Sequence, residues 1–541
     1  MNEVPTILGL LTLVTILALL APKLRVPVPT FMVLGGLVIS LFPGLPRITL
    51  PSDLVFLVFL PPLLYAAAWQ MSWSDFKRNL RPILFLAIGL VLATAVIIMI
   101  VMQWVVPEMS WTLALALGGI LGPPDAIAAT SVTRGQGVPH RLLTILEGES
   151  LINDATGLVI YRIGIAATLT GSFVFFDAVK LFFFSALGGI LLGLVFGWLI
   201  GQIHRFLDDT TIETVLTILT PYAAYLAAEY IHVSGVLATV AAGIVVSRGQ
   251  DNYFSPKMRL QANGVWNTLD FILNGLAFVL IGLQLPAILA ELRDEKTLLT
   301  TLLATIAVYL TVVIVRLLWI YPAAWLPRAL SKRIRARDPM PSAAALTLIG
   351  WCGMRGVVSL AAALAIPQFT NEGTPFPFRG MLLAITFGVV LGSLVIQGLT
   401  LAPLVRWLGL NHQDQSPTEQ EAHLRLELVS AAVVYLENQV ELNVKYPETM
   451  GRIRAHFERQ GELALSQLTM INLSQQAAHE FSCPSRELYL GAFRTQRRKL
   501  KRLRDQGKVH SPLWQQMVDS LDMDESRFRQ AFGMSNKRDK D

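Results

Sequence analysis

One short segment places polar and acidic side chains inside an otherwise apolar stretch: residues 147–154 read EGESLIND. On a helix, Ser150 and Asp154 lie four positions apart and share a face. Glu149 and Asn153 do the same on the adjacent face. An ionisable side chain near the bilayer centre costs about 2.5–3.5 kcal/mol on insertion scales, so a functional role is its default interpretation. The segment therefore predicts a site inside the membrane.

A second carboxylate lies where another apolar stretch is interrupted, because residues 122–125 read GPPD. Two successive prolines remove two amide donors and prevent a regular helix, which frees backbone carbonyls beside Asp125. Carboxylate, hydroxyl, amide and carbonyl oxygens together suit a small alkali cation, whereas histidine or thiolate ligands would indicate a transition metal. The predicted ion- and proton-binding groups are Asp154, Asn153, Asp125, Ser150 and the carbonyl of Pro124, with Asp154 and Asp125 as the carboxylate ligands of Na⁺.

A buried arginine is expected to neutralise one acidic residue of the first segment. Residues 350–356 read GWCGMRG, and their three glycines loosen a helix around Arg355. We predict that Arg355 pairs with Glu149 and holds two helices in register. Asp154 is then the unpaired carboxylate, able to exchange a proton for a cation. In the structural alternative, Asp154 itself pairs with Arg355, and Asp125 only caps the helix that restarts after the prolines.

Membrane-spanning helices are the elements that must position these residues. Of the 541 residues, 53% are hydrophobic and 15% charged, which is typical of an all-α, polytopic membrane protein. Apolar windows long enough to span about 30 Å of hydrocarbon recur along the chain. The thirteen predicted windows lie near residues 5–22, 27–44, 52–71, 82–106, 110–132, 141–169, 176–203, 211–231, 233–248, 264–289, 298–325, 341–367 and 378–407.

Charge divides the chain into a predicted transmembrane domain over residues 1–411 and a helical cytoplasmic domain over residues 412–541, for which we expect a regulatory role. With the N-terminus outside, sixteen basic residues fall in cytoplasmic loops and four in external loops, which agrees with the positive-inside rule and leaves the C-terminus in the cytoplasm. Basic residues in such loops reflect membrane topology, so we expect no nucleic-acid partner. The two cysteines indicate neither a disulfide framework nor a metal site, and no cofactor motif occurs.

The two interruptions, in the fifth and twelfth windows, lie seven windows apart, so their helices run in opposite directions. Interrupted helices at matching positions of two inverted repeats are the best sequence indication of a secondary transporter's binding site. We therefore expect the transported ion to bind near the two interruptions.

Five sequence blocks, in this order, resemble the monovalent cation:proton antiporter-1 family, the NhaP-type sodium/proton exchangers, and especially its bacterial members. They are LPPLL at 60–64, GESLINDA at 148–155, SGVLA at 234–238, GMRG at 353–356 and VIQGLT at 395–400. The resemblance covers the whole membrane part, and five ordered blocks are far more specific than one short motif.

The resemblance implies a homodimer in the cell (inner) membrane, in which a six-helix core domain moves against a dimerisation domain. It also implies that the fifth and twelfth helices cross close to the ion. It implies that Asp154 binds either the cation or the proton, that Ser150 and Asp125 join it, and that the family's buried Arg–Glu pair falls on Arg355 and Glu149. The chain departs from the family pattern at two places. Pro124 replaces a threonine, and residues 65–68 read YAAA where many relatives have an acidic residue.

The predicted function is exchange of a monovalent cation, Na⁺ first and K⁺ or Li⁺ as alternatives, for protons, in pH and sodium homeostasis and without a cofactor. Asn153 in place of a second aspartate, together with the resemblance, favours one cation per proton and electroneutral exchange. Two rival functions are an intramembrane aspartyl protease with Asp125 and Asp154 as its dyad, and an ion channel. The protease leaves Arg355 and the inverted interruptions unexplained.

Overall fold

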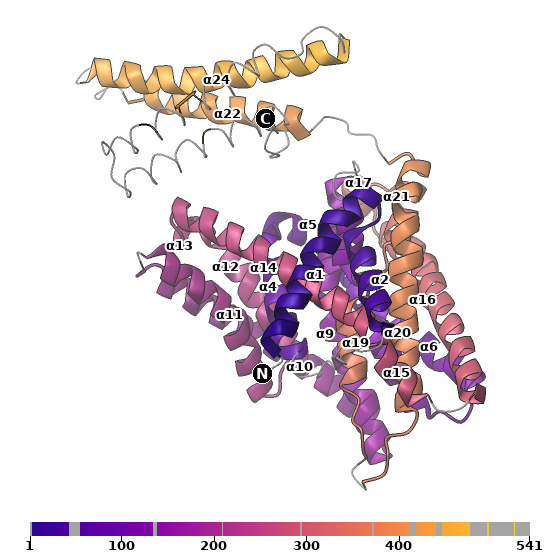
Figure 1. Ribbon diagram of the computed structural model, residues 1–541. Helices are drawn as coiled ribbons and strands as arrows, with labels where there is room; N and C mark the ends of the chain where they lie inside the picture. The colour runs from indigo at the N-terminus through magenta and orange to yellow at the C-terminus, as the bar shows by residue number, and fades with distance from the viewer. Residues whose placement is uncertain are drawn as a thin grey trace. The chain divides into compact units, whose positions relative to one another are not determined.

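The protein is described here from a computed structural model, in which the chain forms two compact units, residues 1–412 and 413–541 (Figure 1). The structure describes residues 3–42, 55–133, 138–207, 209–292, 295–370, 373–410, 417–439, 446–476, 495–496, 502 and 524. The regular secondary structure of these residues is helical, apart from one isolated antiparallel bridge between Phe369 and Pro375. The junction of the two predicted domains, at residues 411–412, lies outside the described residues.

The first half of the membrane unit runs from the N-terminus to the long helix that carries the EGESLIND segment. Its elements are α1 (Glu3–Leu24), α2 (Val28–Ser40), the π-helical η1 (Val55–Phe59), α4 (Leu60–Gln70), α5 (Trp73–Leu84), the π-helical η2 (Phe85–Leu90), α6 (Val91–Val105), α7 (Trp111–Leu121), α8 (Ala126–Thr133) and α9 (His140–Thr170).

The second half repeats the pattern of long apolar helices and one interrupted helix. Its elements are α10 (Phe175–His204), α11 (Thr210–Tyr230), α12 (Gly235–Arg248), α13 (Gln250–Tyr253), α14 (Pro256–Leu283), α15 (Leu285–Glu291), α16 (Glu295–Leu330), α17 (Lys332–Arg337), α18 (Ala343–Trp351), α19 (Val357–Leu364), α20 (Arg379–Gly392), the π-helical η3 (Ser393–Gln397) and α21 (Gly398–Trp407).

Every predicted window contains one, two or three consecutive helices, so the all-α membrane fold is confirmed. Among the described residues, seven helical spans are long and apolar enough to cross a membrane, and three shorter helices are also apolar. Several helices begin where the sequence supplies a serine whose side chain accepts a backbone N–H of the first turn. These N-cap residues are Ser72, Ser110, Ser234, Ser255 and Ser342.

Small residues let the membrane helices approach closely. On α10, a serine or glycine occurs at every fourth position on the buried face that packs against α12. A Cβ added at Gly193 would lie 2.3 Å from the carbonyl oxygen of Ala238, so only glycine permits this spacing. The stripe consists of Ser185, Gly189, Gly193, Gly197 and Gly201.

The helix α9 runs through the interior of the membrane unit and contacts helices from both halves (Figure 1). It starts after Pro139 and ends at Gly171, whose φ of +67° is the left-handed conformation that favours glycine at a helix end. Its 31 residues are long enough for it to carry both a buried ion pair and a cavity-lining carboxylate.

In the second unit, α22 (Pro417–Glu437) packs against α24 (Pro447–Gln476) as a helical pair. An ion pair at 3.1 Å between Arg454 and Glu437 links the two helices. The described part of the tail is therefore helical, as predicted. Its regulatory role stays a prediction.

Candidate functional site

The two interrupted helices meet at their interruptions. α7 ends at Leu121 and α8 begins at Ala126, because Pro123 and Pro124 have no amide hydrogen to continue the helix. The other interruption separates α18 from α19. The backbone N–H of Asp125 donates to the carbonyl of Met354 at 2.7 Å, so the two extended segments are hydrogen-bonded to each other. The predicted crossing is confirmed.

Arg355 holds this crossing together through backbone carbonyls. Its Nε donates to the carbonyl of Leu121 at 3.0 Å and its Nη2 to that of Gly122 at 3.3 Å, while Nη1 donates to Gly353. Its backbone N–H donates to Ser393 Oγ at 2.9 Å. The last carbonyls of a helix have no partner within the helix and carry the negative end of its dipole. A buried guanidinium at the end of α7 satisfies both.

The predicted pairing of Glu149 with Arg355 is wrong, because Glu149 pairs with Arg316 of α16. Arg316 Nη1 lies 2.5 Å from Glu149 Oε1 and Nη2 lies 2.8 Å from Oε2, a bidentate geometry, and both side chains are 1% exposed. The Nε of Arg316 donates to the carbonyl of Ile349 at 3.2 Å. Arg355 is instead turned toward the carbonyls of α7, to which its Nε and Nη2 donate.

A glycine makes room for the true pair. A Cβ added at Gly353 would lie 2.3 Å from Arg316 Cδ, so the loosened backbone of the second interruption lets Arg316 pass on its way to Glu149. The sequence does contain the signal for this partner, since Arg316 is an arginine within an apolar window. It does not show which of the two arginines reaches α9.

Asp154 lies on the same helix in a different environment. It lines a cavity of about 200 Å³ and is 8% exposed. Within the described part of the chain, its carboxylate accepts no hydrogen bond and forms no ion pair, and the alternative pairing of Asp154 with Arg355 is therefore also wrong. Gln70 and Ser131, which line the same cavity, are exposed. Asp154 is thus a buried carboxylate within reach of solvent.

The other predicted site residues surround Asp154 with oxygens. Asn153 Nδ2 donates to the carbonyl of Pro124 at 2.8 Å, whereas its buried Oδ1 has no hydrogen-bond partner among the described residues. Ser150 lines the cavity, and its Oγ accepts the N–H of Ala126 at 3.4 Å. The amide of Asn153 therefore fixes the first interruption and leaves an unpaired acceptor.

Asp125 has two structural contacts and also lines the cavity. Its Oδ1 accepts the N–H of Ile127 at 2.8 Å, so it caps α8 as the structural alternative expected. A Cβ at Gly356 would lie 1.8 Å from Asp125 Oδ2, so the glycine of the second interruption makes room for this carboxylate. Capping uses one carboxylate oxygen and leaves the other facing the crossing.

The cavity includes acidic residues that are absent from the predicted site. Glu147 lies one turn before Ser150 on α9, and Asp270 lies on α14, where Asn274 Nδ2 donates to its Oδ1 at 2.9 Å. The four-residue spacing of Asp270 and Asn274 was visible in the sequence, but their distance from α9 was not. Ala66, where many relatives are expected to have an acidic residue, is buried and not among the cavity-lining residues.

The family model described as "Sodium/hydrogen exchanger, transmembrane" matches residues 9–407. The chain belongs to this family. The predicted resemblance is therefore confirmed, and membership makes the chain a transporter and not an enzyme, which excludes the protease alternative.

Similar proteins carry consistent names. A protein of Mycobacterium bovis that is named an uncharacterized Na(+)/H(+) exchanger is 30% identical over 533 residues, covering 96% of this chain and 95% of that protein. YjcE of Escherichia coli, also named an uncharacterized Na(+)/H(+) exchanger, is 32% identical over 527 residues, covering 92% of this chain and 93% of that protein. A sodium, potassium, lithium and rubidium/H(+) antiporter of Bacillus pumilus is 34% identical over 386 residues, which are 70% of this chain but only 57% of that protein.

Two solved structures of the sodium proton antiporter MjNhaP1 from Methanocaldococcus jannaschii share the fold. The structure at pH 8 gives a TM-score of 0.55 at 19% identity and covers 76% of this chain and 99% of that one. The electron-microscopy structure gives a TM-score of 0.59 at 19% identity and covers 77% and 99%. At this identity the similarity shows the fold alone.

Proposed function

We propose that this exchanger carries a monovalent cation, Na⁺ first, and a proton alternately on Asp154. The observation that supports the proposal is the difference in pairing along α9. Glu149 is neutralised by Arg316, whereas Asp154 is a buried carboxylate in a cavity with no hydrogen bond or ion pair from the described residues. A lone buried carboxylate is costly unless a proton or a cation neutralises it. Either ligand satisfies Asp154, and the two exclude each other.

The oxygens around Asp154 suit an alkali cation. Asp154 and the free oxygen of Asp125 supply negative charge, and Ser150 supplies a hydroxyl oxygen. The unpaired Oδ1 of Asn153 is a buried acceptor in need of a donor or a cation. The carbonyl of Pro124 already accepts a hydrogen bond from Asn153 and has one lone pair left for an ion. Hard oxygen ligands of this kind bind Na⁺, K⁺ or Li⁺ without a cofactor.

One carrier carboxylate supports one cation per proton. Asn153 precedes Asp154 where a second aspartate would add a second exchangeable charge. A carboxylate that is loaded with either ligand is neutral, so the loaded carrier moves no net charge. The proposed stoichiometry is therefore one cation per proton, which makes the exchange electroneutral. The proposed role of the exchanger is pH and sodium homeostasis.

Charge supports an inward-facing cavity in the cell (inner) membrane. The exposed rim residue Gln70 ends α4, a few residues before Lys77 and Arg78. Basic loops face the cytoplasm by the positive-inside rule, so the proposed orientation has the N-terminus outside and the C-terminus inside. In this orientation the cavity admits ions from the cytoplasm. A protease-accessible tag after residue 541, cut in inverted vesicles and protected in intact spheroplasts, would support this orientation.

Two further proposals come from the family resemblance. The protein is a homodimer, which cross-linking in native membranes tests, with a monomer band alone as the contrary result. The second unit regulates transport, and deletion of residues 413–541 is expected to shift the pH profile. An unchanged profile would remove that role.

The transport experiment uses proteoliposomes with a pH-sensitive fluorescent dye. Addition of Na⁺ is expected to move protons through the wild type, and Asp154→Asn is expected to reduce this movement to the level of empty liposomes. The cations in the name of the Bacillus relative, K⁺, Li⁺ and Rb⁺, are assayed in parallel. Asp177→Asn removes an exposed acid at the start of α10 and serves as the control. Normal exchange by Asp154→Asn contradicts the proposal, and single-channel currents would favour a channel.

A further inference from the structure

A basic pocket of the membrane unit shares no lining residue with the cavity that holds Asp154. Its volume is about 890 Å³, and it is lined by residues of α5, the start of η2, α9 and α17. Five of the lining side chains are cationic and one is a carboxylate, a formal excess of four positive charges. The charged residues are Lys77, Arg78, Arg81, Arg141, Arg333 and Asp338.

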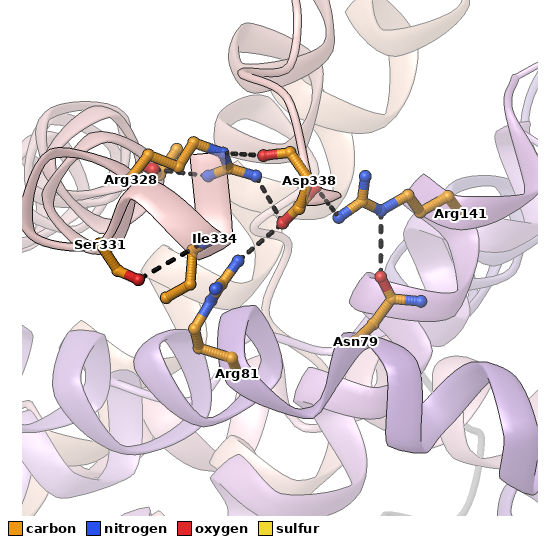
Figure 2. A network of polar contacts seen from close by, with 8 residues as sticks. Asn79, Arg81, Arg141, Arg328, Ser331, Ile334 and Asp338 are labelled. Carbon is orange, nitrogen blue, oxygen red and sulfur yellow. Dashed lines mark hydrogen bonds and ion pairs between the residues drawn. The ribbon is translucent and has the colours of Figure 1, made fainter. Parts of the chain in front are cut away.

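Asp338 organises one side of this pocket (Figure 2). Its Oδ2 accepts Arg81 Nη2 at 2.6 Å and Arg328 Nη2 at 2.8 Å, and its Oδ1 accepts Arg141 Nη2 at 2.8 Å. Arg141 Nε also donates to Asn79 Oδ1 at 3.0 Å. One carboxylate thus holds three guanidinium groups, so its single charge does not neutralise them.

The remaining cations of the pocket have no acidic partner among the described residues. Lys77, Arg78 and Arg333 are exposed, and in the described part of the chain their side chains form no hydrogen bond or ion pair. Arginine forks and a lysine ammonium that converge on one space match the oxygens of a phosphate group. The chemistry of the pocket is therefore that of a phosphate-bearing anion.

The apolar part of the pocket distinguishes a lipid from a soluble phosphate. Leu84 and Phe85 line the pocket and are each 37% exposed. Further along the same span, the exposed residues Leu92, Val96 and Ile100 follow one another at four-residue spacing and share one face of α6. The basic pocket therefore lies at the N-terminal end of a span with an exposed apolar stripe, where headgroup and acyl chains of one molecule can meet.

We propose that this pocket binds the phosphate headgroup of an anionic phospholipid, with the acyl chains along the stripe of α6. In the proposed orientation the pocket faces the cytoplasmic leaflet, where polybasic segments meet anionic lipid. The bound headgroup bridges α5, α9 and α17 at the end of α9 that precedes the ion site. The inference does not depend on the role of Asp154.

Native mass spectrometry of the full-length protein in neutral detergent tests the site. The probes are phosphatidylglycerol and phosphatidylcholine with identical acyl chains. The wild type is expected to prefer phosphatidylglycerol, and the triple variant Lys77→Gln, Arg78→Gln, Arg333→Gln is expected to bind it about tenfold more weakly or worse. The control variant Lys23→Gln, Lys180→Gln, Lys257→Gln loses the same charge elsewhere and is expected to retain the preference.

Two outcomes overturn the proposal. One is a triple variant that binds phosphatidylglycerol as tightly as the wild type. The other is displacement of phosphatidylglycerol by an equal concentration of soluble glycerol 3-phosphate, which would make the pocket a site for soluble phosphate. If the triple variant does not fold, Arg78→Gln alone replaces it, with an expected loss of about threefold. Full affinity in that variant counts against the proposal in the same way.

Discussion

The two carboxylates of α9 lie five residues apart, and their surroundings differ completely. Glu149 forms a bidentate ion pair with Arg316 in which both partners are 1% exposed. Asp154 lines a cavity and has no ion pair among the described residues. The same helix therefore carries one carboxylate in a fixed ion pair and one without a partner among the described residues. Under the proposed mechanism, this difference in pairing, and not a difference in burial, separates the structural carboxylate from the transporting one.

The largest effect on stability is expected at the pair. Glu149→Gln leaves the guanidinium of Arg316 buried without a counter-charge, and breaking a buried pair costs about 3–5 kcal/mol. The measurement is the melting temperature in detergent, with the double variant Glu149→Gln, Arg316→Met as the second arm of a double-mutant cycle. The double variant is expected to recover part of the loss.

The matched control is a second pair on α9. Arg162 Nη2 donates to both carboxylate oxygens of Glu229, at 2.9 and 3.0 Å, with side chains 48% and 33% exposed. Exposed pairs contribute only about 0.2–1 kcal/mol. A double-mutant cycle on Arg162 and Glu229 is therefore expected to give a smaller coupling energy than the cycle on Glu149 and Arg316. Equal coupling energies would show that burial does not strengthen the Glu149–Arg316 pair.

The next effect is expected at the glycine that admits Arg316. Gly353→Ala places a Cβ against Arg316 Cδ, and overpacking of a close-packed interior costs about 1–3 kcal/mol. Because Arg316 must shift, its bidentate hydrogen bonds to Glu149 are distorted, although both charges remain. The melting temperature is compared with that of Gly264→Ala, where an added Cβ meets no atom within 4 Å. Equal melting temperatures for the two variants would contradict the close approach of Arg316 to Gly353.

On the cavity side, Asn153 is expected to affect ion binding more than stability. Asn153→Ala removes the hydrogen bond to the Pro124 carbonyl, a loss of about 0.5–1.5 kcal/mol. It also removes the unpaired Oδ1. The apparent Na⁺ affinity in the transport assay is expected to fall while the melting temperature changes little. An unchanged affinity would exclude Asn153 from the ion site.

The smallest effect is expected at the exposed end of α9, where Arg141 meets Asp338. Burial by itself raises the pKa of Asp338, but the hydrogen bonds and charges of Arg141 and Arg328 outweigh it and hold the pKa below its ordinary value. A lowered pKa means that the carboxylate stabilises the fold above its unfolded-state pKa and that this contribution disappears as pH falls through the folded-state pKa.

Asp338→Asn is therefore expected to cost about 1 kcal/mol near neutral pH, since the pairs are partly exposed. The difference from the wild type is expected to shrink as the pH falls below about 4, the ordinary aspartate pKa. Melting temperatures of both proteins over a pH series make the measurement. A difference that is constant with pH would show that Asp338 contributes no charge-dependent stability.

The helices and the two interruptions could be predicted from the sequence because their causes are local. Pro123 and Pro124 remove amide donors wherever they occur, and apolar windows of membrane length leave few alternatives to a helix. The sequence also predicts an unpaired Asp154, because an arginine is expected to pair with Glu149.

The identity of that arginine could not be predicted. Arg316 and Arg355 are both buried arginines in apolar windows, and the choice between them depends on how α16 and α18 pack against α9. Arg355 is held by the carbonyls at the end of α7, a partner that carries no charge and leaves no signal in side-chain spacing. For the same reason the sequence could not show that Asp270, on α14, lines the same cavity as Asp154. Tertiary contacts between distant segments decide all three cases.

The most direct measurement is cation-induced proton release. Purified protein in weakly buffered detergent solution receives Na⁺, and a pH indicator records the protons released over a series of pH values. If cation and proton compete for Asp154, the wild type releases about one proton per protomer and Asp154→Asn releases none. Glu149→Gln, if folded, still releases protons. Release from Asp154→Asn equal to that of the wild type would contradict the account.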